Sequence, residues 1–311
     1  MTNLKQLSEK PEVLASGHRL CAGCGAPIVV RQVLSAAKTP VVVSCATGCL
    51  EVATTIYPYT SWNCSFIHNA FENSAATISG VETAYRALKK RGKIKHDMKF
   101  IAFGGDGGTY DIGLQSLSGA MERGHNILYV CYDNGAYMNT GIQRSSATPK
   151  GASTTTQPAG KVIPGKTQFP KKLTDIMAAH GIPYVAQASP HNPHDLIRKV
   201  EKALEVEGPC FMNILSVCPR GWRTKTEDGI EISKQATETC FWPLFEVEDG
   251  RKWTVNYKPS EKKPIREWIK LQGRFKHLLK PENQHIIEDI QKEVDRSWQD
   301  LLDKQEASKE K

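Results

Sequence analysis

The chain has 311 residues, enough for one large domain or two small ones, and its 40% hydrophobic and 24% charged content is typical of a globular enzyme. The N-terminal segment lacks the apolar core of a signal peptide, and no stretch approaches about 18 consecutive apolar residues, so we expect a cytoplasmic protein with no membrane contact. The formal net charge is +8, and the one compact basic run is KKRGKIKH at 89–96. No RNA-binding or zinc-finger pattern accompanies this run, so we expect a solvated or protein-docking surface and no nucleic acid partner.

The first half of the chain alternates between helical and strand patterns. Helices are predicted at 26–37, 69–91 and 111–124, and buried strands at 40–45, at the start of 98–108 and at 126–134. In the third helix Asp111 is expected to cap the N-terminus and Gly124 to follow the end. Strand, glycine turn, helix and strand form a βαβ unit, so we expect an α/β fold with a mostly parallel sheet covered by helices on both faces.

The second half continues the pattern after a long loop. Residues 145–169 are rich in Ser, Thr, Gly, Pro and Lys, and a loop of this length inside a compact domain is typically functional. Helices are predicted at 173–181 and 194–208, strands at 182–188 and 209–218, and an irregular chain after Trp222. We expect residues 1–250 to form one domain and residues 251–311 to form a partly helical, irregular C-terminal extension that contacts a partner subunit.

A glycine-rich turn, GGDGG at 104–108, follows the second predicted strand. Glycines let the backbone approach a phosphate group, and the following helix offers free N–H groups. Asp106 is suited to bind Mg²⁺, and Asn134, at the end of the next strand, can add an amide oxygen. This pairing resembles the motif that binds thiamine diphosphate. The alternative is a simple tight turn and an Asn that caps a helix.

Nine cysteines are many for a chain in a reducing compartment, so we expect free thiols or metal ligands. Cys21 and Cys24 form a CxxC pair, and Cys49 and Cys218 follow predicted strands as loop ligands would. A thioredoxin-like pair is disfavoured because polar residues precede the CxxC. Spacing alone leaves zinc and an iron–sulfur cluster equally open. The remaining cysteines are predicted to be core residues (Cys131, Cys210) or are not assigned (Cys45, Cys64, Cys240).

Several ordered motifs together resemble one known family. The chain contains in order GHRLCAGCG, ATGCLEV, IYPYTSW, IHNAFEN, GGDGGTYDIG, YMNTGIQRSSATP and CPRGW, followed by KLQGRF at 270–275. They resemble the β subunits of the 2-oxoacid:ferredoxin oxidoreductase family, on its pyruvate:ferredoxin oxidoreductase (pyruvate synthase) side. The run YMNTG, in place of the YGLTGGQ-like run of the 2-oxoglutarate branch, favours the pyruvate side. The resemblance also favours an iron–sulfur cluster over zinc.

The resemblance implies roles for residues at matching positions. It implies thiamine diphosphate, Mg²⁺ and one [4Fe–4S] cluster as cofactors. The implied cluster ligands are Cys21, Cys24, Cys49 and Cys218. The implied Mg²⁺ ligands are Asp106, Asn134 and the carbonyl of Ala136. The implied cofactor contacts are Thr47, Gly48, Cys49, Gly105, Gly107, Gly108, Met138, Asn139 and Thr140, with Asn139 as the catalytic residue beside the reactive carbon.

The implied reaction is the reversible oxidative decarboxylation of a 2-oxoacid with coenzyme A, in which electrons pass through the cluster to ferredoxin. The implied partners are α, γ and δ type subunits, without which the chain is inactive. The alternatives are the same machinery acting on another small 2-oxoacid or oxalate, and a non-catalytic zinc-binding subunit. One departure from the family pattern is Gly135, where an acidic residue is expected, and this affects either loop flexibility or substrate preference.

Overall fold

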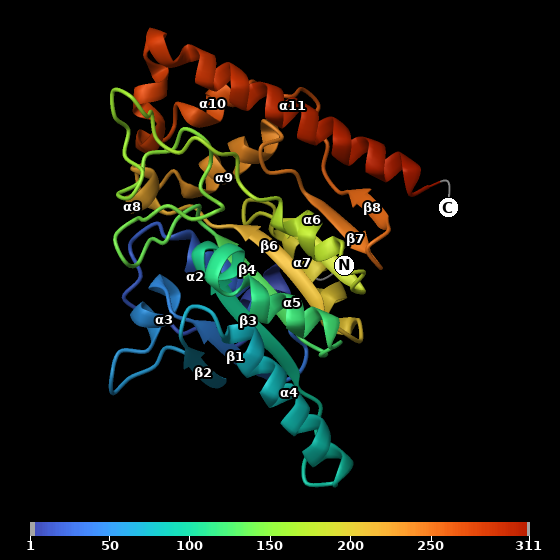
Figure 1. Ribbon diagram of the computed structural model, residues 1–311. Helices are drawn as coiled ribbons and strands as arrows, with labels where there is room; N and C mark the ends of the chain where they lie inside the picture. The colour runs from blue at the N-terminus through green and yellow to red at the C-terminus, as the bar shows by residue number, and fades with distance from the viewer. Residues whose placement is uncertain (1–3, 310–311) are drawn as a thin grey trace.

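The computed structural model describes residues 4–309, and within them eight strands form one sheet (Figure 1). The spatial order is β2-β1-β3-β4-β6-β5-β7-β8. The strands are β1 (Val41–Ala46), β2 (Ser65–Asn69), β3 (Lys99–Gly105), β4 (Leu128–Asp133), β5 (Tyr184–Ala188), β6 (Cys210–Leu215), β7 (Phe245–Glu248) and β8 (Lys252–Val255). The first six in spatial order pair in parallel, and only β7 and β8 are antiparallel, which confirms the mostly parallel α/β fold.

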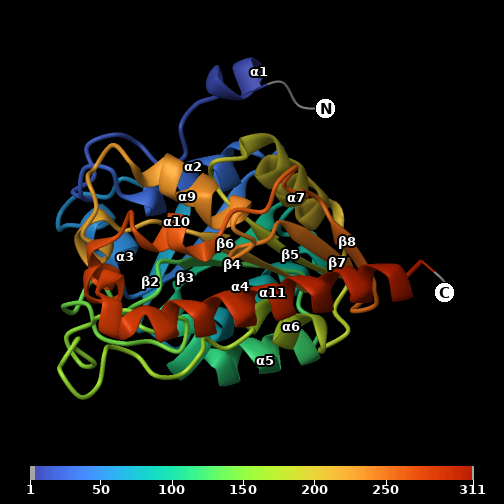
Figure 2. The ribbon, with the colours of Figure 1, turned by 90° about the horizontal axis from the view of Figure 1, so that it is seen from above.

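Helices cover both faces of the sheet, as Figure 2 shows. On one face α2 (Gly25–Ser35) and α7 (Pro193–Glu205) pack against one side of the strands in a single hydrophobic cluster. On the other face lie α4 (Ser74–Lys90), α5 (Leu114–Glu122) and α6 (Leu173–Ala178). β1, β4, β5 and β6 are buried along their whole length because both faces are covered, which explains their continuous apolar sequences.

The C-terminal part packs on the carboxyl-end side of the sheet through a third hydrophobic cluster. It contains α9 (Gly229–Glu238), α10 (Ile265–Ile269), the 3₁₀ helices η2 (Gly273–Leu279) and η3 (Pro281–Asn283), and the long helix α11 (Gln284–Ala307). Leu301 of α11 also joins the cluster that contains α4 to α6. The expected boundary between the domain (1–250) and the C-terminal extension (251–311) falls between β7 and β8. Residues 1–3 of the first range and 310–311 of the second lie outside the described residues.

The remaining short elements are α1 (Leu4–Ser8), α3 (Cys49–Thr54), the π-helical turn η1 (Gly107–Ile112) and α8 (Pro219–Trp222). Within residues 4–309, none of the helices has the length and the apolar character needed to cross a membrane. Cys131 and Cys210 are completely buried in β4 and β6, so their prediction as core residues is confirmed.

Three details of the sequence prediction are wrong. The helix expected to begin near Asn69 begins at Ser74, because Asn69 is the last residue of the edge strand β2. The side chains of β2 are partly exposed, so its sequence lacks the hydrophobic pattern of a strand. Asp111 does not cap α5: it lies in η1, and its carboxylate accepts hydrogen bonds from Ser146. The region after Trp222 is not irregular, since it forms α9, β7 and β8.

Candidate active site

A pocket lies at the carboxyl ends of β1, β3 and β4, where the predicted cofactor residues meet. We call it the cofactor pocket; its empty volume is about 330 Å³, including the part open to solvent. Its lining includes eleven predicted residues: Thr47, Gly48, Cys49, Gly105, Gly107, Gly108, Asn134, Ala136, Met138, Asn139 and Thr140. Phe71, Tyr132 and Tyr137 also line it and were not predicted. Asp106 lies beneath the pocket and is completely buried.

Three oxygen atoms converge at the floor of this pocket. The amide oxygen of Asn134 lies 2.9 Å from Asp106 Oδ1 and 2.8 Å from the carbonyl oxygen of Ala136. All three are acceptors, so they repel one another unless a cation lies between them or the amide turns to donate from its nitrogen. In an octahedral Mg²⁺ site with bonds of about 2.0–2.1 Å, neighbouring ligand oxygens are about 2.9 Å apart. The predicted ligands therefore fit adjacent positions around Mg²⁺.

Asp106 is held in place from two sides. Its Oδ1 accepts from the backbone N–H of Asn134 at 3.2 Å, and its Oδ2 accepts from the hydroxyl of Ser145. Burial, and next the nearby charge of Asp133, raise the pKa of Asp106 well above its ordinary range. An ionised carboxylate at this position therefore needs a positive partner, which Mg²⁺ would supply.

The loop that carries Ser145 depends on a buried lysine. The Nζ of Lys166 donates to the carbonyl oxygens of Ser145 at 3.3 Å, Ser146 at 3.1 Å and Thr148 at 2.6 Å. Lys166 is 1% exposed, so this ammonium group is committed to the loop. Ser145 lies within a quoted family motif, whereas Lys166 carries no recognisable sequence signal.

The glycine turn has no room for side chains. A Cβ at Gly107 would lie 2.4 Å from the ring of Tyr137, and a Cβ at Gly108 would lie 2.7 Å from the carbonyl oxygen of Phe71. These glycines begin η1, whose first N–H groups have no partner within the helix and are available to an anion. π-Helical turns occur frequently at functional sites. The turn therefore fits the diphosphate of the predicted cofactor.

An unpartnered hydroxyl points to a ligand in the same pocket. Tyr132 is buried, lines the pocket, and its hydroxyl has no hydrogen-bond partner within the described chain. A Cβ at Gly48 would lie 2.8 Å from this hydroxyl, so a side chain at this position of the ATGC turn would crowd it. Buried polar groups are nearly always hydrogen-bonded, so a bound polar molecule is the natural partner.

The four predicted cluster cysteines lie together beside this pocket. Cys24 is the N-cap residue of α2, Cys49 begins α3, and Cys218 is the N-cap residue of α8, where its Sγ accepts from the N–H of Gly221 at 3.3 Å. Burial raises the pKa of Cys24 to about 12 and that of Cys49 to about 11, and the neighbouring thiols, Cys21 and Cys218 among them, add to both shifts. Helix N-termini stabilise thiolates, and a positive centre would compensate their mutual repulsion.

The spacing of these thiols bears on the choice between zinc and iron. Across residues 4–309, no three His, Cys, Asp or Glu side chains are close enough to hold a single metal ion. The mutual effect of the four thiols on the pKa values of Cys24 and Cys49 shows that they are neighbours. The choice of an iron–sulfur cluster over zinc rests on the family resemblance.

Comparisons with known proteins define the class first. Residues 46–214 match the family described as thiamine pyrophosphate enzyme, C-terminal TPP binding domain, and this range contains the whole cofactor pocket. The chain therefore carries a thiamine diphosphate-binding enzyme domain. A solved structure of a 2-oxoglutarate:ferredoxin oxidoreductase from Magnetococcus marinus shares the fold, with a TM-score of 0.52, 22% identity, and coverage of 73% of this chain and 78% of that chain.

Near full-length relatives define the family. Pyruvate synthase subunit PorB of Thermotoga maritima is 55% identical over 99% of this chain and 98% of its own, and PorB of Methanocaldococcus jannaschii is 55% identical over 92% and 95%. Ketoisovalerate oxidoreductase subunit VorB of Pyrococcus abyssi is 45% identical over 92% and 91%. The chain belongs to this family of pyruvate synthase and related 2-oxoacid:ferredoxin oxidoreductase subunits.

Proposed function

We propose that this chain is the subunit that binds thiamine diphosphate, Mg²⁺ and one [4Fe–4S] cluster in an enzyme that oxidises pyruvate. The reaction is the reversible conversion of pyruvate and coenzyme A to acetyl-CoA and CO₂, with electrons leaving through the cluster to ferredoxin. The observation that best supports this proposal is that oxygen atoms of Asp106, Asn134 and Ala136 lie together at the glycine turn, beside a group of four cysteines.

Each part of the pocket has a task in this proposal. Asp106, Asn134 and the carbonyl of Ala136 hold Mg²⁺, and the N–H groups of the glycine turn receive the diphosphate. When bound, thiamine diphosphate supplies an electron sink for cleavage of the bond to the carboxylate, and the cluster supplies one-electron transfer. Asn139 is exposed at the rim of the pocket, where its amide can hydrogen-bond to an oxygen of the substrate.

The cysteines lie where electrons would leave the pocket. Cys49 lines the cofactor pocket and belongs to the group of four thiols, so it joins the two sites. Met138 also lines the pocket and packs over Gly221 next to Cys218: a Cβ at Gly221 would lie 2.2 Å from the Met138 sulfur. In this proposal the contact would pack the chain closely between the two cofactor sites.

Partner subunits complete the site in this proposal. We propose that α, γ and δ type subunits, or fused equivalents, contribute the remaining cofactor and substrate contacts, and that the C-terminal extension from residue 251 forms part of their contact surface. The relatives are named as subunits, which supports an enzyme of several chains.

Anaerobic purification together with these partners tests the proposal. We expect brown protein with about four iron atoms for this chain's cluster, thiamine diphosphate, and pyruvate oxidation that depends on coenzyme A. Stoichiometric zinc without iron would overturn it. Pyruvate, ketoisovalerate, 2-oxoglutarate and oxalate should be assayed in parallel, because one relative is named for ketoisovalerate. A higher kcat/KM for any acid other than pyruvate would reassign the substrate and leave the cofactor sites intact.

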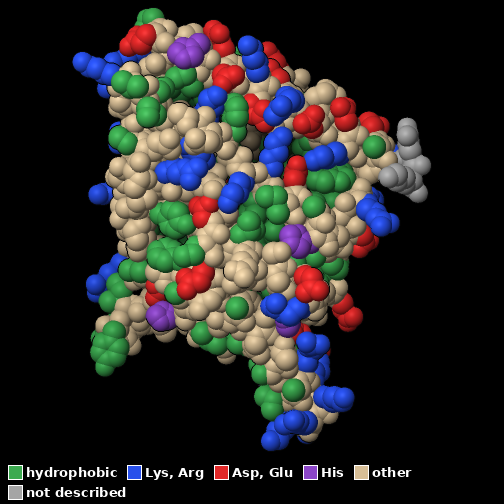
Figure 3. All heavy atoms as spheres, viewed as in Figure 1, with side chains coloured by type: hydrophobic (Ala, Val, Ile, Leu, Met, Phe, Trp, Pro, Cys, Tyr) green, Lys and Arg blue, Asp and Glu red, His purple; other side chains and the backbone are tan. Residues whose placement is uncertain are grey.

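The basic end of α4 is a candidate docking surface for ferredoxin. Lys89, Lys90, Arg91, Lys93 and Lys95 are exposed there, and Figure 3 shows blue side chains where this helix ends at the bottom of the molecule. An acidic electron carrier would be attracted to such a surface, and salt would screen the attraction. We expect the ferredoxin-coupled rate to fall steeply with rising salt while the dye-coupled rate stays constant. Equal salt dependence of both rates would exclude this surface.

A further inference from the structure

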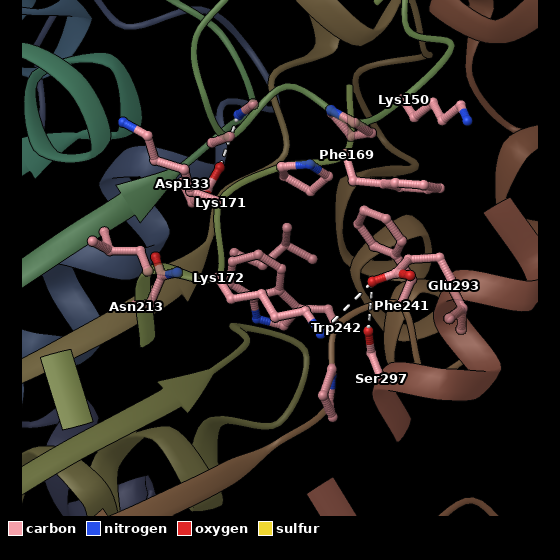
Figure 4. Close-up of a pocket in the computed structure, with 18 of the residues that line it drawn as sticks. Asp133, Lys150, Phe169, Lys171, Lys172, Asn213, Phe241, Trp242, Glu293 and Ser297 are labelled. Carbon is pink, nitrogen blue, oxygen red and sulfur yellow. Dashed lines mark hydrogen bonds and ion pairs between the residues drawn. The ribbon is translucent and has the colours of Figure 1, made fainter. Parts of the chain in front are cut away.

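A second and larger cavity lies between the carboxyl end of the sheet and the helices α10 and α11 (Figure 4). Its empty volume, counted with the open mouth, is about 1220 Å³, which is more than the roughly 300–1,000 Å³ of a typical small-molecule site. We call it the aromatic cavity, because its walls include Phe169, Phe241, Trp242, Trp268 and Phe275. Figure 4 shows Phe169, Phe241 and Trp242 on one side of the space, with Asn213 on the opposite side.

Three buried polar atoms in the lining of this cavity have no partner. They are Asn213 Oδ1, Trp268 Nε1 and Arg274 Nη2, and none of these residues is more than 2% exposed. Unpartnered buried polar atoms are rare in folded proteins, and three around one cavity indicate that something bound there satisfies them. Two of the three are donors, so the bound group must be chiefly an acceptor.

Arg274 is the strongest of these donors and has no ion pair within the described chain. Its Nε donates to Gln272 Oε1 at 2.9 Å, and its guanidinium carbon lies 3.8 Å from the centre of the Trp222 ring. The charge of Asp133 acts on Arg274, but in residues 4–309 the two form no salt bridge. The Asp133 oxygens accept from the Tyr110 hydroxyl at 2.6 Å and from the Gly135 N–H at 3.0 Å. Burial lowers the pKa of Arg274 to about 9, and the charge of Asp133 opposes this shift.

Gly135 packs closely against this guanidinium. Its φ of +71° is in the left-handed region, and a Cβ there would lie 3.0 Å from Arg274 Nη1. A side chain at this position would therefore cover the guanidinium, and an acidic side chain would pair with it. The glycine that departs from the expected family pattern leaves Arg274 facing the cavity.

The lysines at the mouth do not compete for the same ligand. Lys150 pairs with Asp289, Lys171 pairs with Asp111 at 3.3 Å, and Lys172 pairs with Glu293 at 3.7 Å. Figure 4 shows Lys172 reaching across to Glu293. Among the Lys and Arg side chains that line the cavity in the described structure, Arg274 is thus the one without a salt bridge.

We propose that the aromatic cavity binds a small organic carboxylate, whose apolar body lies between the aromatic side chains and whose carboxylate accepts hydrogen bonds from Arg274 and Trp268. A planar guanidinium matches a carboxylate in a two-point hydrogen bond, and apolar walls disfavour a doubly charged phosphate. The bound carboxylate is also connected to Asn134, a proposed Mg²⁺ ligand. Trp222 stacks on Arg274 and donates from Nε1 to the carbonyl of Asn134 at 2.6 Å. This last step rests on the proposed function, whereas binding itself does not.

Titration of the full chain with 4-phenylbutyrate, followed by tryptophan fluorescence and calorimetry, tests the proposal. We expect saturable binding that weakens about tenfold or more when the neutral 4-phenylbutanamide replaces the acid, because the amide cannot form the charged pair. Arg274→Gln should weaken binding of the acid to the level of the amide. Arg266→Gln, an exposed arginine of α10 that donates to Gln284, is the matched control and should change nothing.

A second variant keeps the test decisive if Arg274→Gln does not fold. Ser297→Trp fills the mouth of the cavity and leaves the buried charge unchanged, so it should also abolish binding. Equal affinity for acid and amide, unchanged binding in Ser297→Trp, or a crystal structure with ordered water alone on the three polar atoms at saturating probe would overturn the proposal. So would loss of binding in the complex with partner subunits. Thiamine diphosphate binding is measured separately, so that either site can fail without the other.

Discussion

The cofactor pocket and the aromatic cavity share one short segment of chain and use alternate residues of it. Asn134 and Ala136 line the cofactor pocket, whereas Asp133 and Gly135 line the aromatic cavity. In the first pocket the Asn134 amide oxygen faces two other acceptors unless the amide turns, and this arrangement suits a cation. In the second, two of the three unpartnered polar atoms are donors, and these suit an anion. The two pockets are therefore expected to bind groups of opposite charge.

Asp106→Ala gives the largest expected separation of the two sites. It removes the one carboxylate among the three converging oxygens, so we expect Mg²⁺-dependent thiamine diphosphate binding to weaken on the order of 100-fold or more. The iron content and 4-phenylbutyrate binding should remain unchanged, because Asp106 lines neither of those sites. Calorimetric titration with thiamine diphosphate and Mg²⁺ measures the effect.

Asp97→Ala is the matched control for that variant, because Asp97 is exposed and forms a surface ion pair with Lys89. It should bind thiamine diphosphate as the unaltered chain does. If Asp106→Ala retained full affinity, the assignment of the oxygen group as the Mg²⁺ site would be wrong.

Cys49→Ser tests the thiol group next to the cofactor pocket. Removal of one of four ligands should lower the iron content from about four atoms to below about one, with loss of the brown colour. Cys64→Ser is the matched control, since Cys64 is also partly buried and does not interact with the four thiols. Iron analysis after anaerobic purification distinguishes the two. Equal iron in both variants would remove Cys49 from the ligand set.

The fold and the cofactor pocket were predictable from sequence because their signals are local. Buried parallel strands are continuous apolar runs, and the pocket is built from short motifs at strand ends, such as the GGDGG turn around Asp106. The edge strand β2 and the helix α9 were missed, because a partly exposed strand and a short helix with mixed composition have weak patterns.

The aromatic cavity was not predictable for a different reason. Phe169, Asn213 and Arg274 come from a loop, a strand and a 3₁₀ helix that are far apart in sequence, and each alone is an ordinary residue. Lys166 was not predictable either, because it donates a hydrogen bond to the carbonyl of Ser145 from a loop that contains no recognisable motif. Only tertiary packing shows that these groups are buried and which of them lack partners. Gly135 was noticed in the sequence, but its effect became clear only beside Arg274.

Gly107→Ala should affect the cofactor pocket by a moderate amount. The added methyl group would lie 2.4 Å from the Tyr137 ring, so the ring must move into the space that the cofactor would occupy. We expect thiamine diphosphate affinity to fall about tenfold, as for overpacking by about 1–3 kcal/mol. Gly80→Ala is the control: nothing lies within 4 Å of its Cβ position in α4, and it should stabilise the chain by about 0.5–1 kcal/mol. Unchanged affinity in Gly107→Ala would show that the ring yields elsewhere.

Trp222→Phe is the finest test, because it removes a hydrogen bond that connects the two sites. A smaller aromatic ring remains beside Arg274, but the 2.6 Å bond from the indole N–H to the carbonyl of Asn134 is lost. We expect the free energy of unfolding to fall by about 0.5–1.5 kcal/mol and thiamine diphosphate affinity to fall a few-fold. Trp242→Phe loses a comparable bond, to Ala188, so it should lower stability equally without changing that affinity. If the two variants have equal thiamine diphosphate affinities, the two sites are adjacent but independent. If only Trp222→Phe loses thiamine diphosphate affinity, the aromatic cavity is coupled to the Mg²⁺ ligands.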